Sequence, residues 1–303
     1  MARARATLAP RDQGAKPVSE ETKPGPVGRQ PRWRAPAGAT DCHCHVFGPE
    51  SRYPYTAVRA YTPPDASLDE YRALLAGIGF SRGVIVQPSV YGTDNRASEA
   101  GIKALGSAGR GVAVLAADVG AAELRRLDGA GFRGVRFNLA TLPDSSDASL
   151  EAMARKLAPL GWHIQIFAEA ARLAAMAGRL AALPVEVVID HLGLPELAAG
   201  VAQPGVQAVL RLLGGGRTWL KLSGAYRVDP LTPRWPGATP FAKAYLAANP
   251  DRLVWGTDWP HPNLAGPMPD DGELFDLLLD WVPDEATRTK ILVENPARLY
   301  RFD

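Results

Sequence analysis

The strongest constraint on the fold of this chain is the alternation of short β-rich apolar runs with longer amphipathic stretches. The runs at 84–86 and 187–189 contain only Val and Ile, which is typical of parallel strands covered on both faces. Strands that alternate with helical stretches in this way predict βαβ units and one parallel sheet. The expected strands are 40–46, 83–87, 112–116, 134–138, 163–167, 185–190, 218–223 and 253–257.

Eight such units, without a Gly-x-Gly-x-x-Gly string after the first strand, favour a closed (β/α)8 barrel over a doubly wound sheet. In such a barrel the functional groups lie at the carboxyl ends of the strands. We expect the insertions 53–66 and 228–240 on that side. The expected helices are 68–78, 95–107, 121–130, 148–160, 169–183, 203–213, 241–248, 274–281 and 285–295.

Residues 1–38 differ from the rest of the chain. They are rich in Pro, Gly, Arg and Lys, show no periodicity and lack the apolar core of a secretory signal. We predict a flexible or loosely draped arm here, followed by one catalytic domain at 39–303.

Composition excludes several classes of partner. The net charge of +2 comes without a basic stripe, so nucleic acid is not expected, and no apolar run is long enough to span a membrane. Cys42 and Cys44 are too close in sequence to form an unstrained disulfide, which favours a reducing, cytoplasmic location. The remaining candidate partners are a small-molecule substrate and further copies of the chain in a homo-oligomer.

His43 and His45 end the first expected strand. Residues two apart on a strand share a face, so both imidazoles are expected to point into the barrel, and Cys42 and Cys44 towards the helices. This alternation argues against a four-ligand zinc knuckle. A His-x-His pair at a strand end is suited to holding a divalent metal or to polarising a carbonyl oxygen.

Further ionisable residues follow other strands. Asp258 and His191 end the last and the sixth strand, so they are expected to join the histidine pair, with Asp258 as a metal ligand or a general base. His261 lies in the next loop, as a support of the site or as a turn residue. His163 opens its strand, which places it at the opposite end of the barrel, and Phe167 occupies the mouth end of that strand.

Arg136 and Arg227 are candidates for gripping a substrate carboxylate, because a guanidinium can bind it through two parallel bonds. No Gly-x-Ser-x-Gly elbow is present, so a serine-triad hydrolase is unsupported. Further expected substrate-binding residues in mouth-side loops are Tyr61, Ser89, Tyr91 and Asn95.

Five strings in order carry a resemblance: DCHCHVFGP from Asp41, GTDN from Gly92, RGVRFN from Arg133, DHLG from Asp190 and GTDWPHPN from Gly256. The chain resembles the pyrone-dicarboxylate hydrolase-like lactonases of the amidohydrolase superfamily. The resemblance implies a distorted (β/α)8 barrel and hydrolysis without an obligatory metal.

Carried over by position, the resemblance implies that Asp258 activates water while His43, His45 and His191 polarise the lactone carbonyl. Substrate polar groups would be held by Tyr61, Ser89, Arg136 and Arg227. Two positions depart from the pattern: Leu142 stands where a second arginine is expected, and Phe167 where a tyrosine is expected. The reaction class is therefore expected to hold, whereas a dicarboxylate substrate is not.

The leading hypothesis is a hydrolase that opens the ring of a small carboxylated lactone of the pyrone-dicarboxylate, muconolactone or sugar-acid type, with no cofactor required. One alternative is a sugar-acid lactone isomerase. Another is a metal-dependent decarboxylase or lactonase with one Zn or Mn bound by His43, His45, His191 and Asp258, although Phe167 supplies no ligand. A binding module without activity is disfavoured, because the polar cluster is nearly intact.

Overall fold

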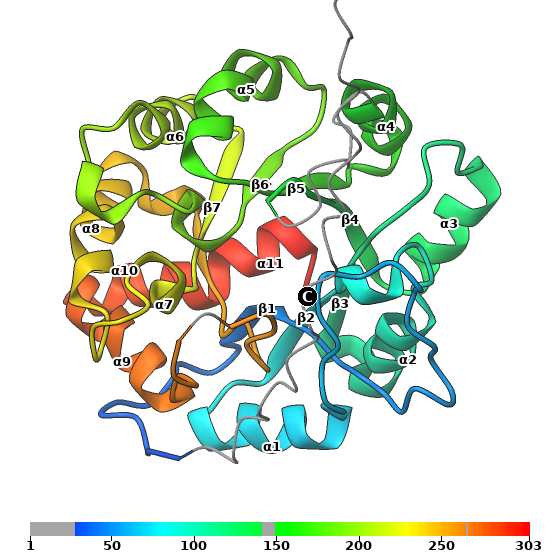
Figure 1. Cartoon of the computed structure of the whole chain (residues 1–303), viewed down its shortest axis with the longest axis horizontal. Coiled ribbons are helices and arrows are strands. Elements are labelled where there is room, and N and C mark those ends of the chain that lie inside the picture. Colours follow the sequence, from blue (N-terminus) through cyan, green and yellow to red (C-terminus); the bar gives the residue numbers. More distant parts are fainter. Residues whose placement is uncertain (1–27, 141–148, 265) are drawn as a thin grey trace, which may run out of the picture.

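The computed structural model describes residues 28–140, 149–264 and 266–303. Eight parallel strands follow one another around the sheet in sequence order, which confirms the expected (β/α)8 barrel (Figure 1). The strand expected at 112–116 begins three residues earlier. The strands are β1 (Thr40–Cys44), β2 (Arg82–Val86), β3 (Gly109–Ala113), β4 (Phe132–Asn138), β5 (His163–Phe167), β6 (Val187–Ile189), β7 (Thr218–Leu222) and β8 (Leu253–Trp255).

The connecting helices form the outer ring of the barrel (Figure 1). The short α7 was not expected from the sequence, and the stretch expected at 285–295 forms α10, a π-helical turn and the start of α11. The helices are α1 (Leu68–Ile78), α2 (Arg96–Leu105), α3 (Ala121–Gly129), α4 (Leu150–Leu157), α5 (Ala170–Ala182), α6 (Pro204–Gly214), α7 (Ala225–Val228), α8 (Thr239–Ala248), α9 (Asp271–Trp281), α10 (Glu285–Thr289) and α11 (Asn295–Tyr300).

The barrel closes where the ends of β1 and β8 meet. The Asp258 N–H donates to the His43 carbonyl at 2.7 Å, and the His45 N–H donates to the Trp259 carbonyl at 2.7 Å. Buried Asp41 adds a clamp, since its carboxylate accepts from the backbone and hydroxyl of Thr257. The sequence strings around His43 and Asp258 are therefore joined by hydrogen bonds.

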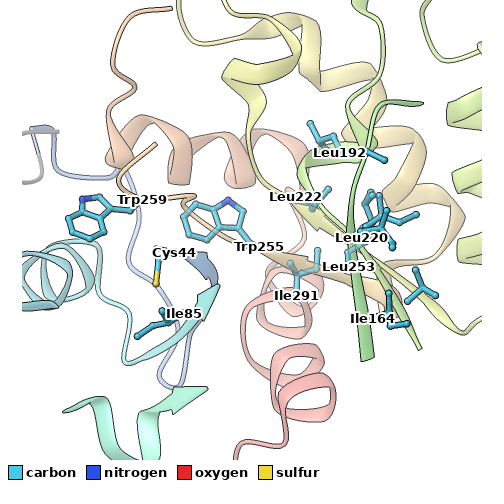
Figure 2. Packing of buried hydrophobic residues seen from close by; sticks show 14 of the residues in the cluster. Cys44, Ile85, Ile164, Leu192, Leu220, Leu222, Leu253, Trp255, Trp259 and Ile291 are labelled. Carbon is cyan, nitrogen blue, oxygen red and sulfur yellow. The ribbon is translucent and has the colours of Figure 1, made fainter. Parts of the chain in front are cut away.

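The two cysteines lie on different faces of β1. Cys44 packs in the outer cluster beside Ile85 and Trp259, as expected (Figure 2). Cys42 instead belongs to the apolar cluster of Val84, Val188 and other strand residues that α11 covers, so its expected outward direction was wrong. A register shift between Asp41 and Cys44 breaks the alternation and explains the difference.

The described end of the N-terminal segment packs against α9. The Trp33 ring stacks on Phe275 with centroids 4.2 Å apart, and Arg32 forms ion pairs with Asp276 and Asp280. These residues of the expected arm are thus held on the barrel, whereas 1–27 lie outside the described residues. Among the described residues, no helix is long and apolar enough to cross a membrane.

Candidate active site

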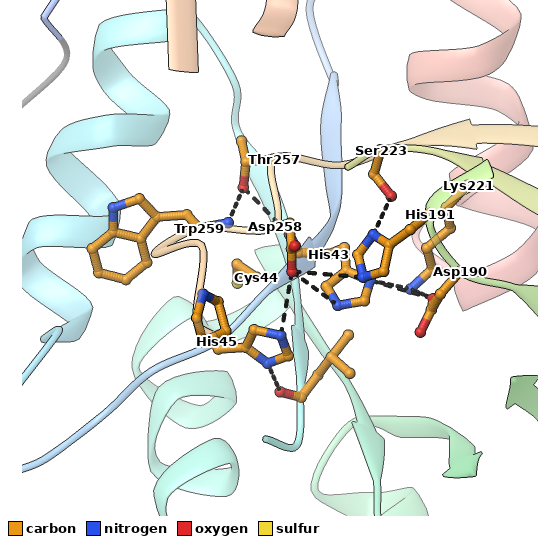
Figure 3. A network of polar contacts seen from close by, with 12 residues as sticks. His43, Cys44, His45, Asp190, His191, Lys221, Ser223, Thr257, Asp258 and Trp259 are labelled. Carbon is orange, nitrogen blue, oxygen red and sulfur yellow. Dashed lines mark hydrogen bonds and ion pairs between the residues drawn. The ribbon is translucent and has the colours of Figure 1, made fainter. Parts of the chain in front are cut away.

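The structure brings together the carboxylate and the three histidines that the sequence singled out (Figure 3). They come from the ends of β1, β6 and β8, and all four side chains are buried. Asp258 Oδ1 lies 3.6 Å from Nε2 of His43, 3.5 Å from Nε2 of His45 and 3.8 Å from Nε2 of His191. One carboxylate oxygen thus faces three imidazole nitrogens.

Backbone strain turns two of these side chains inward. Asp258 has φ +65° and His191 has φ +50°, which are left-handed values that residues other than glycine seldom adopt. The Asp258 turn is held by the His261 N–H, which donates to the Asp258 carbonyl at 2.7 Å. Strained backbone of this kind is typical of functional sites, where the surrounding structure maintains it.

The second oxygen of Asp258 is fully engaged. Its Oδ2 accepts from Arg227 Nη2 at 2.7 Å, from Arg227 Nε at 2.8 Å and from the Tyr226 hydroxyl at 2.5 Å. Burial alone raises the pKa of Asp258, but Arg227 and His191 hold it well below its usual range. Asp258 is therefore a carboxylate at neutral pH with one oxygen left for chemistry.

The three histidines are neutral at neutral pH. Burial lowers the pKa of His43 and His45 and brings that of His191 to about 4. The His45 Nδ1 lies 2.7 Å from the carbonyl of Val86 and must donate to it, so its Nε2 carries a lone pair.

Three of these residues, His43, His191 and Asp258, fit one divalent metal. Nε2 of His43 and Oδ1 of Asp258 are buried without a hydrogen-bond partner among the described residues. Ligand atoms of His43, His191 and Asp258 lie within 4.8 Å of one another. A tetrahedral zinc site with bonds of about 2.0–2.1 Å has edges of about 3.3 Å, near the observed separations from Oδ1.

A pocket with an empty volume of about 320 Å³ opens above this cluster. The guanidinium of Arg136 stacks over the Phe167 ring at 5.0 Å from its centroid. A neighbouring hollow shares Ser89, Arg136 and Asn138 with the pocket. The pocket lining comprises His45, Tyr61, Ser89, Arg136, Asn138, Phe167, His191, Arg227, Asp258, Pro262 and Asn263.

Comparison with known proteins places this site in a family. Residues 40–302 match the Amidohydrolase family, which is nearly the whole barrel. The chain belongs to the Amidohydrolase family. The family-level resemblance drawn from the sequence motifs is therefore confirmed.

Individual relatives of this amidohydrolase cover nearly all of its length. It is 40% identical over 282 residues to 2-pyrone-4,6-dicarboxylate hydrolase of Comamonas testosteroni, covering 89% of this chain and 92% of the relative. It is 36% identical to 4-sulfomuconolactone hydrolase of Hydrogenophaga intermedia, covering 89% and 90%. An apo crystal structure from Agrobacterium tumefaciens is similar, with a TM-score of 0.82 at 29% identity, covering 90% and 99%.

Two residues expected to bind substrate do not line the amidohydrolase pocket. Tyr91 is buried, and its hydroxyl accepts from the Gly48 N–H at 2.8 Å. The Asn95 amide exchanges hydrogen bonds with the Val114 backbone at 2.9 and 3.1 Å. Both side chains therefore brace loops, and their polar groups are used by the backbone.

The remaining residues singled out in the sequence lie at the opposite end of the barrel, beside the site or outside the described residues. His163 packs edge-on against Tyr300 of α11, at the amino-terminal end of the barrel as expected. His261 contacts the Tyr226 hydroxyl at 3.2 Å and thus supports the site indirectly. Arg227 lines the pocket but is paired with Asp258, and Leu142 lies outside the described residues.

Sequence reasoning missed the polar layer beneath the amidohydrolase pocket. Lys221, Gln165 and Asp190 are completely buried there, and Arg136 Nε lies 3.3 Å from Asp190 Oδ2. A signal for Lys221 exists in the sequence, since a lysine inside the apolar run Thr-Trp-Leu-Lys-Leu is unusual for a buried strand. For Gln165 and Asp190 the partners come from other strands, so only the fold shows their role.

Proposed function

We propose that this amidohydrolase opens the ring of a small carboxylated lactone by adding water to the ester carbonyl. The observation that carries the proposal is the asymmetry of Asp258. One of its oxygens is held by Arg227 and Tyr226, and the other faces the pocket beside three neutral imidazoles. The named hydrolase relatives, whose substrates by name are a pyrone dicarboxylate and a sulfomuconolactone, support the same reaction class.

In the proposed mechanism, Asp258 Oδ1 takes a proton from a water molecule whose oxygen attacks the lactone carbonyl. Because Arg227 keeps the carboxylate a weak base, proton transfer proceeds as the new C–O bond makes the water more acidic. Collapse of the tetrahedral intermediate breaks the ring C–O bond. The departing ring oxygen receives the proton held by Asp258, so the product is the ring-opened hydroxy acid.

The pocket residues supply orientation and charge stabilisation. His191 lines the pocket, and with its Nδ1 accepting from the Ser223 hydroxyl at 3.0 Å its Nε2–H donates to the carbonyl oxygen as that oxygen becomes negative. The Nε2 lone pair of His45 is an acceptor on the same wall of the pocket. Arg136 offers its guanidinium to an acid group of the substrate, and Phe167 provides an apolar wall for the ring. Since His43, His191 and Asp258 fit a divalent metal, a metal bound by them would act as a Lewis acid on the carbonyl.

The test is Asp258→Asn, assayed on a panel of carboxylated lactones by acid release. We expect a folded variant whose turnover falls by at least about 10²-fold, the range for losing a general base. Turnover like that of the wild type would contradict the mechanism. NMR of the product separates hydrolysis from isomerisation, because an isomerase returns a second lactone in place of an open acid.

A further inference from the structure

Lys221 is a completely buried lysine in the polar layer beneath the pocket, and it is not among the residues that line the pocket. It projects from β7 towards three acceptors. Its Nζ lies 2.8 Å from Gln165 Oε1, 3.2 Å from His43 Nδ1 and 3.4 Å from Asp190 Oδ1. An ammonium group has N–H donors and no acceptor, so Lys221 donates hydrogen bonds to Gln165 and His43 while its contact with Asp190 is an ion pair.

The other hydrogen bonds of the polar layer are consistent with Lys221 acting as a donor. The Gln165 side chain donates a hydrogen bond from Nε2 to Asp190 Oδ2 at 3.0 Å. Its Oε1 therefore remains to accept from Lys221. The carboxylate of Asp190 lies 3.3 Å from Arg136 Nε and 3.4 Å from Lys221 Nζ, so two basic side chains face it. Asp190 is therefore an anion, and a buried anion requires a cation close by.

This arrangement has a consequence for the ring of His43. Two groups compete for its Nδ1: Lys221, which donates, and Asp190 Oδ1, which accepts and lies 3.3 Å away. Hydrogen-bond geometry is satisfied with Lys221, while Asp190 Oδ1 has no hydrogen-bond partner among the described residues. A neutral imidazole carries one N–H, so an Nδ1 that accepts places the proton on Nε2.

We propose that Lys221 is a positioning residue that keeps the ring proton of His43 on Nε2, directed at the free oxygen of Asp258. Nε2 of His43 lies 3.6 Å from Oδ1 of Asp258, and catalytic hydrogen bonds of this length commonly shorten in the substrate complex. This inference deepens the proposed function, on which its catalytic meaning rests. The tautomer itself is independent of the substrate.

The opposite tautomer would make a different site. If Nδ1–H donated to Asp190, Nε2 would present a lone pair, and the carboxylate–histidine pair would have the arrangement that commonly supports a metal ligand. Lys221 thus determines whether Nε2 of His43 carries a proton directed at Asp258 or offers a lone pair to a metal ion. Removing its N–H donors would release Nδ1 to Asp190.

The direct test is the tautomer of His43 in protein labelled with ¹⁵N-histidine and stripped of metal by a chelator. Two-bond ¹H–¹⁵N correlation spectra distinguish protonated from unprotonated ring nitrogens, and His43→Gln assigns the signals. We expect protonated Nε2 and unprotonated Nδ1 in the wild type. A protonated Nδ1 in the wild type would overturn the proposal, with no variant needed.

Lys221→Met, which preserves length and removes the donors, should reverse the pattern to Nδ1–H. Its affinity for zinc, measured by competition with a chromophoric chelator, should rise about tenfold, the lower end of the range for outer-shell changes. Lys290→Met, at an exposed lysine, is the matched control and should change neither readout. An unchanged tautomer in Lys221→Met would contradict the proposal. If Asp258→Asn keeps activity while the tautomer is as expected, the mechanism fails and this inference stands.

Discussion

The guanidinium of Arg227 lies 2.7 Å from Oδ2 of Asp258, so the arginine that the sequence suggested as a substrate grip is the ion-pair partner of the candidate base. It also donates to the carbonyl of Pro262 at 2.9 Å, which secures the loop after β8. The side chain is 15% exposed, so part of it still faces the pocket. Arg227 therefore orients the carboxylate of Asp258 and also lines the pocket.

We predict that Arg227→Met moves the acid limb of the kcat–pH profile to higher pH. The cation holds the pKa of Asp258 low against burial, so without it burial raises that pKa, and more of the base is protonated in mildly acidic buffer. A pH series of initial rates measures the shift. Arg227→Lys retains the charge and should shift the limb less, whereas identical profiles for both variants would contradict the pairing.

Arg136→Met should raise KM for carboxylated lactones. A charge-assisted hydrogen bond contributes about 1.5–3 kcal/mol, which corresponds to roughly 10- to 150-fold in kcat/KM. An uncharged lactone of similar size is the control substrate, and its kcat/KM should change much less. Equal losses for both substrates would show that Arg136 acts through Asp190 and not on the acid group.

Asp41→Asn should destabilise the fold. The carboxylate of Asp41 accepts from the His43 N–H, the Thr257 N–H and hydroxyl, and the Tyr71 hydroxyl, all buried. An amide cannot accept at all these positions, so we expect a loss of about 1–3 kcal/mol in urea unfolding. Tyr71→Phe removes one of these bonds and should cost less. A neutral effect of Asp41→Asn would argue against the clamp between β1 and β8.

The free energy of unfolding should fall as pH drops from about 6.5 to 4. Burial lowers the pKa of His163 to about 3 and that of His191 to about 4, so in this window the unfolded chain binds protons that the folded chain does not. Each histidine contributes up to about 1.4 kcal/mol per pH unit. Asp41, whose pKa burial raises to about 6, opposes the trend as a single group.

His163→Leu isolates one of these contributions, because His163 lies far from the pocket beside Tyr300. Its urea-unfolding series between pH 5 and 6 should show a shallower slope than the wild type, by nearly one proton. An unaltered slope would mean that His163 is solvated or protonated in the folded protein.

Metal removal distinguishes water activation by Asp258 alone from metal-assisted hydrolysis. We predict that protein freed of metal by a chelator, and checked by elemental analysis, keeps its lactonase turnover, because Asp258 and the imidazoles suffice for water activation. A stoichiometric metal that is lost together with activity, and that restores it on return, would assign the cluster to metal-assisted hydrolysis.

The barrel and the four residues of the central cluster could be predicted from the order of residues along the chain. Alternating apolar and amphipathic runs specify parallel strands and helices, and strand ends share one edge of the barrel, so His43, His45, His191 and Asp258 could be placed together without coordinates. This prediction was possible because each of these residues is positioned by the end of its own strand, which the local sequence pattern indicates.

The contacts that these groups make become visible only in the folded barrel. The register shift in β1 turned Cys42 inward. The Arg227–Asp258 pair and the acceptors around Lys221 bring together residues from different elements of the barrel. Tyr91 and Asn95 likewise proved to brace loops. Contacts between strands depend on register, twist and side-chain length together, and no local pattern in the chain records that combination.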